Sequence, residues 1–190
     1  GRLLVTQYSS ALLLYGADGV RLQQIALPGY MVAQHAVETP RGTYIVCHRG
    51  RRHGVSEVDG AGRVVRVYYD GPPGPGPLQL NEPRHVTQFA AGRRLLIADR
   101  GNSRVLSLTA DLKLDRVLLT ADHDQLDELW PWRLSVNAET RRLVVGGERL
   151  LRYLQLLVQR AQRQVIVGHL RHKRQDHSAA RFVSGEQVGL

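Results

Sequence analysis

Pro83-Arg84-His85-Val86 and Pro131-Trp132-Arg133-Leu134 align 48 positions apart without a gap. The alignment continues through three further pairs of short runs: Arg93-Arg94-Leu95-Leu96-Ile97 with Arg141-Arg142-Leu143-Val144-Val145, Val105-Leu106-Ser107-Leu108 with Tyr153-Leu154-Gln155-Leu156, and Arg116-Val117-Leu118-Leu119 with Gln164-Val165-Ile166-Val167. A repeat of this length, with four short apolar runs in each unit, is typical of a propeller blade. The spacing therefore predicts an all-β chain, a β-propeller of four-stranded antiparallel blades.

The clearest unit runs from Pro83 to about Leu119. Its four expected strands are Val86–Phe89, Leu95–Ala98, Val105–Leu108 and Arg116–Leu119. The turns between them, at 90–93, 100–103 and 109–113, each contain Gly, Asn or Asp. Short apolar runs separated by such turns form an antiparallel meander, and 3.6-residue periodicity is absent.

The remaining sequence fits the same spacing less completely, and about four blades are expected. We predict a partial blade at 1–27, whole blades at about 30–70, 78–120 and 128–170, and a basic tail or the start of a further blade at 171–190. The Gly/Pro-rich segment 71–77 has the composition of a linker. Because it falls between a fourth strand and the next first strand, an inter-blade loop is the preferred interpretation.

Composition limits the classes of function. The chain has one cysteine, Cys47, so it cannot form an intramolecular disulfide or a multi-cysteine zinc site, and we expect a reducing, cytoplasmic location. No apolar run is long enough to span a membrane. The net charge of +9 comes almost entirely from arginine, since Lys113 and Lys173 are the only lysines. This charge favours RNA or an acidic protein as partner, or else reflects an arginine-rich solvated surface.

The unit around 78–105 resembles an NHL repeat. Two stretches carry the resemblance, Leu78-Gln79-Leu80-Asn81-Glu82-Pro83-Arg84-His85-Val86 and Leu95-Leu96-Ile97-Ala98-Asp99-Arg100-Gly101-Asn102-Ser103-Arg104-Val105. They match a proline-led first strand and a V-A-D-x-G-N-x-R-I/V hairpin. The other units depart from this pattern, with Gly146-Gly147-Glu148-Arg149 and Cys47-His48-Arg49-Gly50 at the hairpin. The resemblance covers roughly residues 1–170 and is strong for about 40 of them.

The resemblance implies a six-bladed ring closed by strands from the two chain ends. Arg181-Phe182-Val183 lies 48 positions after Arg133-Leu134-Ser135 and has the pattern of a first strand, which the partial first blade lacks. Either the chain is an excerpt of a longer ring, which the family favours, or this segment closes a four-bladed ring.

The hairpin motif itself is interpreted as structural. Asp99 and Arg104 flank a tight turn, close enough for a charge-assisted hydrogen bond, and Gly101-Asn102 is expected to supply positive φ angles.

In a four-stranded meander, the loops between second and third strands emerge on the same rim as the connections between blades. The candidate binding residues on this rim are Arg49, Arg51, Arg52, His53, Arg84, His85, Arg100, Trp132 and Arg133, with Ser103, Trp130 and Arg149 beside them. Guanidinium groups bind phosphate or carboxylate, and aromatic rings stack on bases or cover apolar side chains. Alternatively, the tryptophans pack between blades and the arginines solvate loops. The other rim is also basic, at Arg93-Arg94 and Arg141-Arg142.

No catalytic or metal site is expected. Cys47 and His48 are adjacent on a strand and point to opposite faces, so a zinc site with His53 is disfavoured. The acidic segment 122–128 is interpreted as a solvated loop rather than a calcium site. The sequence contains no Gly-x-Ser-x-Gly, phosphate-loop or dinucleotide motif, and no cofactor or small-molecule substrate is indicated.

The expected function is recognition without catalysis. NHL propellers commonly form the substrate-binding part of tripartite-motif (TRIM-NHL) ubiquitin ligases and of Brat-like translational repressors. The resemblance therefore implies protein partners, single-stranded or hairpin RNA, or both, bound at the basic rim. The alternatives are a purely protein-protein scaffold and, more remotely, a metal-dependent lyase or hydrolase. Any ligase activity would belong to domains that one cysteine cannot build.

Overall fold

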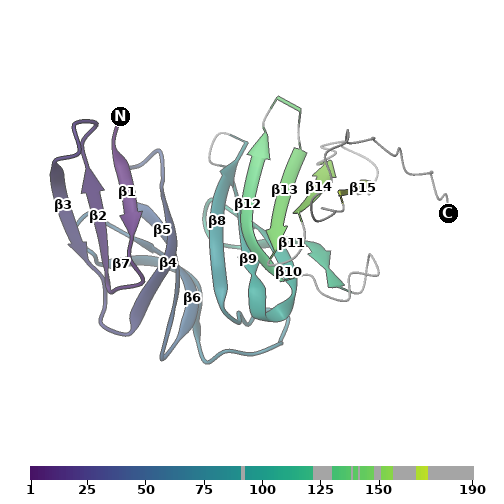
Figure 1. Cartoon of the computed structure of the whole chain (residues 1–190). Helices are drawn as coiled ribbons and strands as arrows, with labels where there is room; N and C mark the ends of the chain where they lie inside the picture. Colours follow the sequence, from purple (N-terminus) through teal and green to yellow (C-terminus); the bar gives the residue numbers. More distant parts are fainter. Residues whose placement is uncertain are drawn as a thin grey trace, which may run out of the picture.

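The chain folds into antiparallel β-sheets that follow one another in sequence order across the molecule (Figure 1). The computed structural model describes residues 1–90, 93–121, 130–137, 139–140 and 142–147, together with the backbone of 151–155 and 166–170. Within these residues the first sheet has three strands and the other three sheets have four each. This confirms the predicted all-β fold of four-stranded antiparallel sheets.

Each sheet is a meander in which strands adjacent in sequence pair with each other. The first sheet contains β1 (Leu3–Thr6), β2 (Ala11–Tyr15) and β3 (Arg21–Ala26). The second contains β4 (Met31–Glu38), β5 (Tyr44–Gly50), β6 (His53–Val58) and β7 (Val64–Gly71). The third contains β8 (Pro83–Phe89), β9 (Arg94–Asp99), β10 (Arg104–Thr109) and β11 (Leu114–Thr120), with a 3-10 turn η1 (Arg100–Asn102) between β9 and β10. The fourth contains β12 (Pro131–Asn137), β13 (Arg142–Gly147), β14 (Leu151–Gln155) and β15 (Ile166–Leu170).

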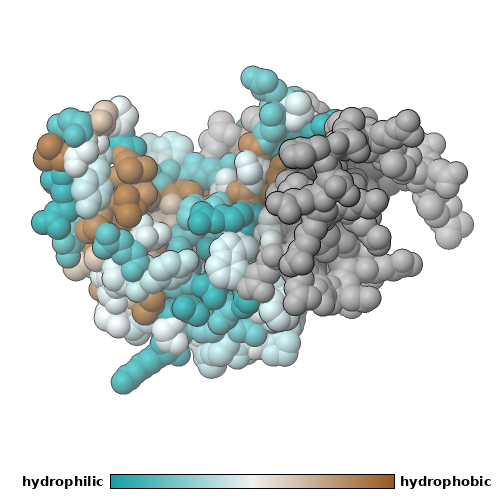
Figure 2. All heavy atoms as spheres, viewed as in Figure 1, coloured by the Kyte–Doolittle hydropathy of each residue, from teal (hydrophilic) through white to brown (hydrophobic). Residues whose placement is uncertain are grey.

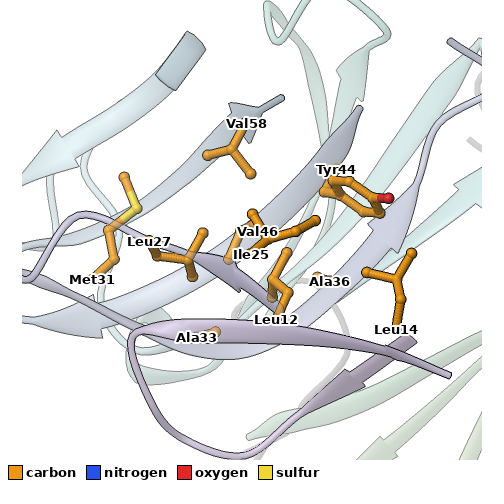
Figure 3. Close-up of a cluster of buried hydrophobic side chains, with 10 residues drawn as sticks. All are labelled: Leu12, Leu14, Ile25, Leu27, Met31, Ala33, Ala36, Tyr44, Val46 and Val58. Carbon is orange, nitrogen blue, oxygen red and sulfur yellow. The ribbon is translucent and has the colours of Figure 1, made fainter. Parts of the chain in front are cut away.

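The middle strands of the sheets are continuous apolar runs in the sequence because their side chains point alternately to two buried faces. On β5, Tyr44 and Val46 pack against the first sheet, where Leu12 and Ile25 meet them (Figure 3). Ile45 and Cys47, which alternate with them on β5, belong to the core shared with the third sheet. Successive side chains point to opposite faces of a strand. A sheet covered on both faces therefore needs apolar residues at every position of its middle strands.

The outer strands are more polar because they lie at the periphery of the stack. On β11, Asp115, Arg116 and Val117 are exposed, and only Leu119 is fully buried. The first sheet differs again, because its outward face is open. Leu3, Val20 and Leu22 are 57–61% exposed there, and brown apolar side chains gather on this sheet at the left of Figure 2.

The Gly/Pro-rich segment 71–77 lies in the connection between β7 and β8, as predicted: Gly71 ends β7, and the loop continues to residue 82. The NHL-like hairpin holds this loop in place. Asp99, fully buried, accepts hydrogen bonds from Asn81 N (2.8 Å), Asn102 Nδ2 (2.8 Å) and Arg104 Nε (2.7 Å). Asn102 and Arg104 in turn donate to carbonyl groups of the loop at Gly74, Gly76 and Gln79. Burial raises the pKa of the Asp99 carboxyl, and the three donors and the Arg104 charge oppose that increase. The interpretation of this motif as structural is confirmed.

The turn between β5 and β6 contains only Arg51 and Arg52, because β5 continues to Gly50 and β6 begins at His53. One local prediction was wrong. In the 100–103 turn the left-handed residue is Ser103 (φ +50°), not Gly101 or Asn102. Gly101 is needed for a different reason: its N–H donates to Asn81 O (2.7 Å), and an added Cβ would lie 2.9 Å from that oxygen.

Several predictions lie outside the described residues. These are the acidic segment 122–128, Arg141, Arg149, the candidate strand at 181–183 and the basic tail 171–190. In the part of the chain that is described, no helix is long and apolar enough to cross a membrane.

Candidate functional site

Three strands form the inner side of the stack, and each carries the same irregularity. β4, β8 and β12 are the first strands of their sheets, and β8 contacts both of the others; we call them the inner strands. Each has one extra residue relative to its partner strand: Gln34 in β4, Arg84 in β8 and Trp132 in β12. Bulges bend a strand and redirect a side chain, and they are common beside functional sites.

The three bulge residues contact one another across the sheets. Arg84 Nη1 donates to Gln34 Oε1 at 2.8 Å. The same guanidinium group lies over the ring of Trp132, 4.7 Å from the centroid. Arg84 therefore links the second sheet to the fourth through one hydrogen bond and one cation–π contact.

Glu82 organises the arginines of the rim. Its carboxylate is paired with Arg100 (2.6 Å), Arg84 (3.4 Å) and Arg49 (3.5 Å). Its backbone N–H donates to His53 Nδ1 at 3.0 Å. Burial opposes ionisation of this carboxyl, but the three guanidinium charges prevail and hold its pKa below the ordinary value.

The two tryptophans lie against the same arginines. The Arg100 guanidinium is 4.9 Å from the Trp130 ring centroid and 5.3 Å from that of Trp132. Trp130 remains 47% exposed, so its outer face is available to a partner. Trp130 can therefore both pack between blades and bind a partner at the surface. The ring of Trp132 is instead in contact with the guanidinium groups of Arg84 and Arg100.

A pair of stacked histidines lies beside the bulges. The His35 and His85 rings are 3.8 Å apart with an interplanar angle of 22°. Burial, assisted by the nearby charge of Arg133, lowers the pKa of His35 to about 4. Burial, His35 and Arg133 lower the pKa of His85 to about 3. Both imidazoles are therefore neutral at physiological pH.

The remaining rim arginines differ in how far they are neutralised. Arg52 pairs with Asp70 (3.4 Å) and lies 5.7 Å from the Tyr30 ring centroid. Arg51 is exposed, and no side-chain partner for it is found among the described residues. Arg133 is likewise exposed.

The nine predicted site residues divide into groups. Arg49, His53, Arg84 and Arg100 converge on Glu82, and Arg84 and Arg100 bring Trp132 to them. Arg51 and Arg52 form the exposed turn, and Arg133 lies exposed on β12. His85 differs from expectation, because it is only 8% exposed and packs against His35 instead of facing solvent.

Sequence reasoning missed Glu82, Gln34, His35 and Asp70. The repeat spacing contained the signal for two of them, since Gln34 and His35 lie 50 positions before Arg84 and His85. Because Glu82 and Asp70 neutralise part of the rim, it is less positive than the arginine count indicated.

The described residues hold no group of three His, Cys, Asp or Glu side chains placed to bind a metal. Cys47 is fully buried, and burial raises the pKa of its thiol. A hollow on the open face of the first sheet is lined by Leu3, Val5 and Tyr15, away from the rim cluster.

No protein-family model and no curated protein matches this sequence. Solved structures do resemble it. A protein of unknown function from Bacteroides caccae is 20% identical, with a TM-score of 0.56; 87% of this chain and 57% of that one are covered. A chain of the nidogen/laminin complex is 17% identical, with a TM-score of 0.59 and coverage of 82% and 55%. Virginiamycin B lyase from Staphylococcus aureus is 12% identical, with a TM-score of 0.60 and coverage of 90% and 52%.

These likenesses define the class of the protein. The sheets are β-propeller blades, as in the structures that they resemble. The chain spans little more than half the length of these three solved chains. At such low identity the likeness establishes the fold alone.

Proposed function

We propose that this propeller is a non-catalytic recognition platform that binds an acidic segment of a protein partner at its rim. Two observations carry the proposal. The exposed pair Arg51–Arg52 directly precedes His53, which accepts a hydrogen bond from the Glu82 N–H, and the exposed ring of Trp130 lies against Arg100 of the arginine cluster around Glu82. Guanidinium groups beside an aromatic face bind carboxylates and cover adjacent apolar side chains, and Trp and Arg are enriched at binding hot spots.

A protein partner is preferred over RNA because much of the rim charge is already paired. Arg49, Arg84 and Arg100 share Glu82, and Arg52 pairs with Asp70. Nucleic-acid affinity depends on several arginines that are free to neutralise phosphates. One of the solved structures with this fold belongs to a protein complex, that of nidogen and laminin, which supports the same preference.

We further propose that the propeller is of the NHL type, as in TRIM-NHL ligases or translational regulators. It is supported by the hairpin in which Asp99, Asn102 and Arg104 bind the preceding loop. The single cysteine supports a reducing, cytoplasmic setting.

The test compares labelled Asp/Glu-rich peptides that contain aromatic residues with single-stranded and hairpin RNA, by fluorescence anisotropy at about 50 and 200 mM salt. We expect peptide binding that falls at least about tenfold in the double variant Arg51→Gln/Arg52→Gln. The matched control is Arg41→Gln/Arg93→Gln, which makes the same charge change in the turns of the opposite rim.

Peptide binding that is equal in both double variants would contradict the proposed surface. RNA binding that loses about 10³-fold or more in affinity between the two salt concentrations, with no peptide binding, would replace the protein partner by RNA.

A further inference from the structure

The position that follows each inner-strand bulge carries His35 in β4, His85 in β8 and Arg133 in β12. Each pairs with the strand beside it immediately after the register shift: His35 with Cys47, His85 with Ala98 and Arg133 with Gly146. Because the shifts are equivalent and the inner strands are in contact, these three side chains lie at matching positions of one layer.

The imidazole pair has unused hydrogen-bonding capacity. His35 Nδ1 accepts a hydrogen bond from the Val86 backbone N–H at 3.5 Å, which leaves its Nε2 to other partners. His85 is 8% exposed, and its buried Nδ1 has no hydrogen-bond partner within the described chain. A buried polar atom without a partner is unusual and marks a place where a ligand atom can bind.

Arg133 supplies a positive charge that no carboxylate balances in the part of the chain that is described. Its exposed side chain forms no hydrogen bond or ion pair there, in contrast to Arg84 and Arg100, which share Glu82. The positive charge of Arg133 helps to lower the pKa of both His35 and His85. Among the groups that face the pair, Arg133 from β12 is the ionised one, and the Val86 N–H from β8 is a neutral donor.

We propose that Arg133, His35 and His85 form a binding site for a small oxyanion, either a carboxylate or a tetrahedral anion, at the inner strands. The guanidinium group offers paired donors to two anion oxygens, and an imidazolium adds a further charged donor. The anion cancels the field of Arg133 at the imidazoles, so a bound anion favours their protonation. Binding therefore takes up a proton and tightens as the pH falls.

Sulfate is the first probe, because its charge stays constant between about pH 4 and 8 while histidine titrates. Histidine ring signals are followed by NMR across this range, with and without sulfate. We expect sulfate to raise the pKa of His35 from about 4 by about one unit. By linkage, that increase corresponds to a gain in sulfate affinity of about tenfold in total as the pH falls through this interval. Arg133→Gln should abolish the shift, and Arg133→Lys should retain a weaker one. The matched control, Arg116→Gln on the exposed strand β11, should leave it unchanged.

A sulfate shift that persists in Arg133→Gln, or the absence of any shift in the folded wild-type protein, would overturn the site. The fold of each variant is verified by the dispersion of its amide NMR spectrum. Acetate is the second probe, and displacement of sulfate by acidic peptides would identify a partner's carboxylate as the source of the anion.

The site is independent of the rim surface proposed above. Arg51→Gln/Arg52→Gln should lose peptide binding and keep the sulfate response. Failure of one proposal is thereby distinguishable from failure of the other.

Discussion

Glu82 adopts a left-handed backbone conformation, with φ of +50°, which non-glycine residues rarely occupy. This conformation, together with the hydrogen bond from its N–H to His53, directs the carboxylate toward Arg49, Arg84 and Arg100. Unfavourable backbone conformations persist where the surroundings compensate for them, and three ion pairs provide that compensation here.

Substitution Glu82→Gln should destabilise the protein by about 1–2 kcal/mol, because it leaves three neighbouring guanidinium groups without their shared anion. The Glu82 side chain is 28% exposed, so the loss is smaller than for a fully buried pair. Urea denaturation at neutral pH measures the effect. Arg63→Gln, which removes an exposed pair with Asp59, is the control and should change the urea midpoint little.

Gly101 provides a second test at the scale of single residues. A Cβ at this position would lie 2.5 Å from Asn81 Cγ and 2.9 Å from Asn81 O, so Gly101→Ala should displace the loop and cost about 1–3 kcal/mol. Gly29→Ala is the matched control, since an added Cβ there meets nothing within 4 Å. Equal thermal midpoints for the two variants would show that the close approach of Asn81 is not required.

At the scale of elements, the buried histidines make the contacts between strands sensitive to acid. His48 of β5 is fully buried and bonds Ser56 Oγ of β6 at 3.0 Å. Burial lowers its pKa to about 4 from an unperturbed value of 6.5. The stacked pair joins β4 to β8 and has similarly low pKa values.

The folded state binds fewer protons than the unfolded state at these histidines, so stability should fall as the pH drops below about 6.5 toward 4. Each fully buried histidine contributes up to about 1.4 kcal/mol per pH unit within this window. Urea denaturation between pH 7.5 and 5 measures the slope. His48→Gln should reduce the slope of unfolding free energy against pH by the contribution of about one proton. An unchanged slope would contradict the conclusion that His48 is buried in its neutral form.

The bulges of the inner strands bring Arg84 into contact with two neighbouring sheets, which a substitution can test. Arg84→Met keeps an apolar stem but removes the hydrogen bond to Gln34 and the cation–π contact with Trp132. We expect a loss of about 1–3 kcal/mol and faster amide exchange in β4 and β12 relative to the unbulged strand β10. Exchange that changes only within β8 would show that Arg84 does not couple the sheets.

At the scale of the whole molecule, each pair of neighbouring sheets shares a core. Ile45, Cys47 and Val55 of the second sheet pack with Ile97 and Leu106 of the third. Stability in such a stack is approximately a sum of sheets and the interfaces between them. A cavity on one side of an interface should therefore loosen the sheet on the other side.

Cys47, the only cysteine, reports on this coupling because its buried thiol reacts only after the core around it opens. Ile97→Ala should cost about 2–5 kcal/mol and accelerate labelling of Cys47 by a thiol reagent by at least about tenfold. Val117→Ala, at a position of β11 that is 42% exposed, is the control and should change the rate little. Similar labelling rates in both variants would show that the second and third sheets open independently.

Much of the architecture was predictable from sequence, because strands and turns follow from local alternation and from the residues that turns require. The apolar runs at 95–98 and 105–108 became the buried middle strands of a sheet. The prediction was wrong where the backbone departs from a regular hairpin. The sequence favoured Gly101 and Asn102 for the left-handed conformation, because these residue types adopt it most readily, but Ser103 adopts it in the structure.

The sequence by itself determined the repeat, the class of fold and the structural hairpin of Asp99 and Arg104, because these depend on contacts within one unit or its adjoining loop. Only the tertiary structure decided which arginines are free. Glu82 and Asp70 neutralise several of them, and the bulges place His35 beside His85 and Arg84 over Trp132. The contacts at the bulges join residues about 50 positions apart, and the ion pairs Glu82–Arg100 and Asp70–Arg52 join residues 18 apart. The geometry of both depends on how strands and sheets pack.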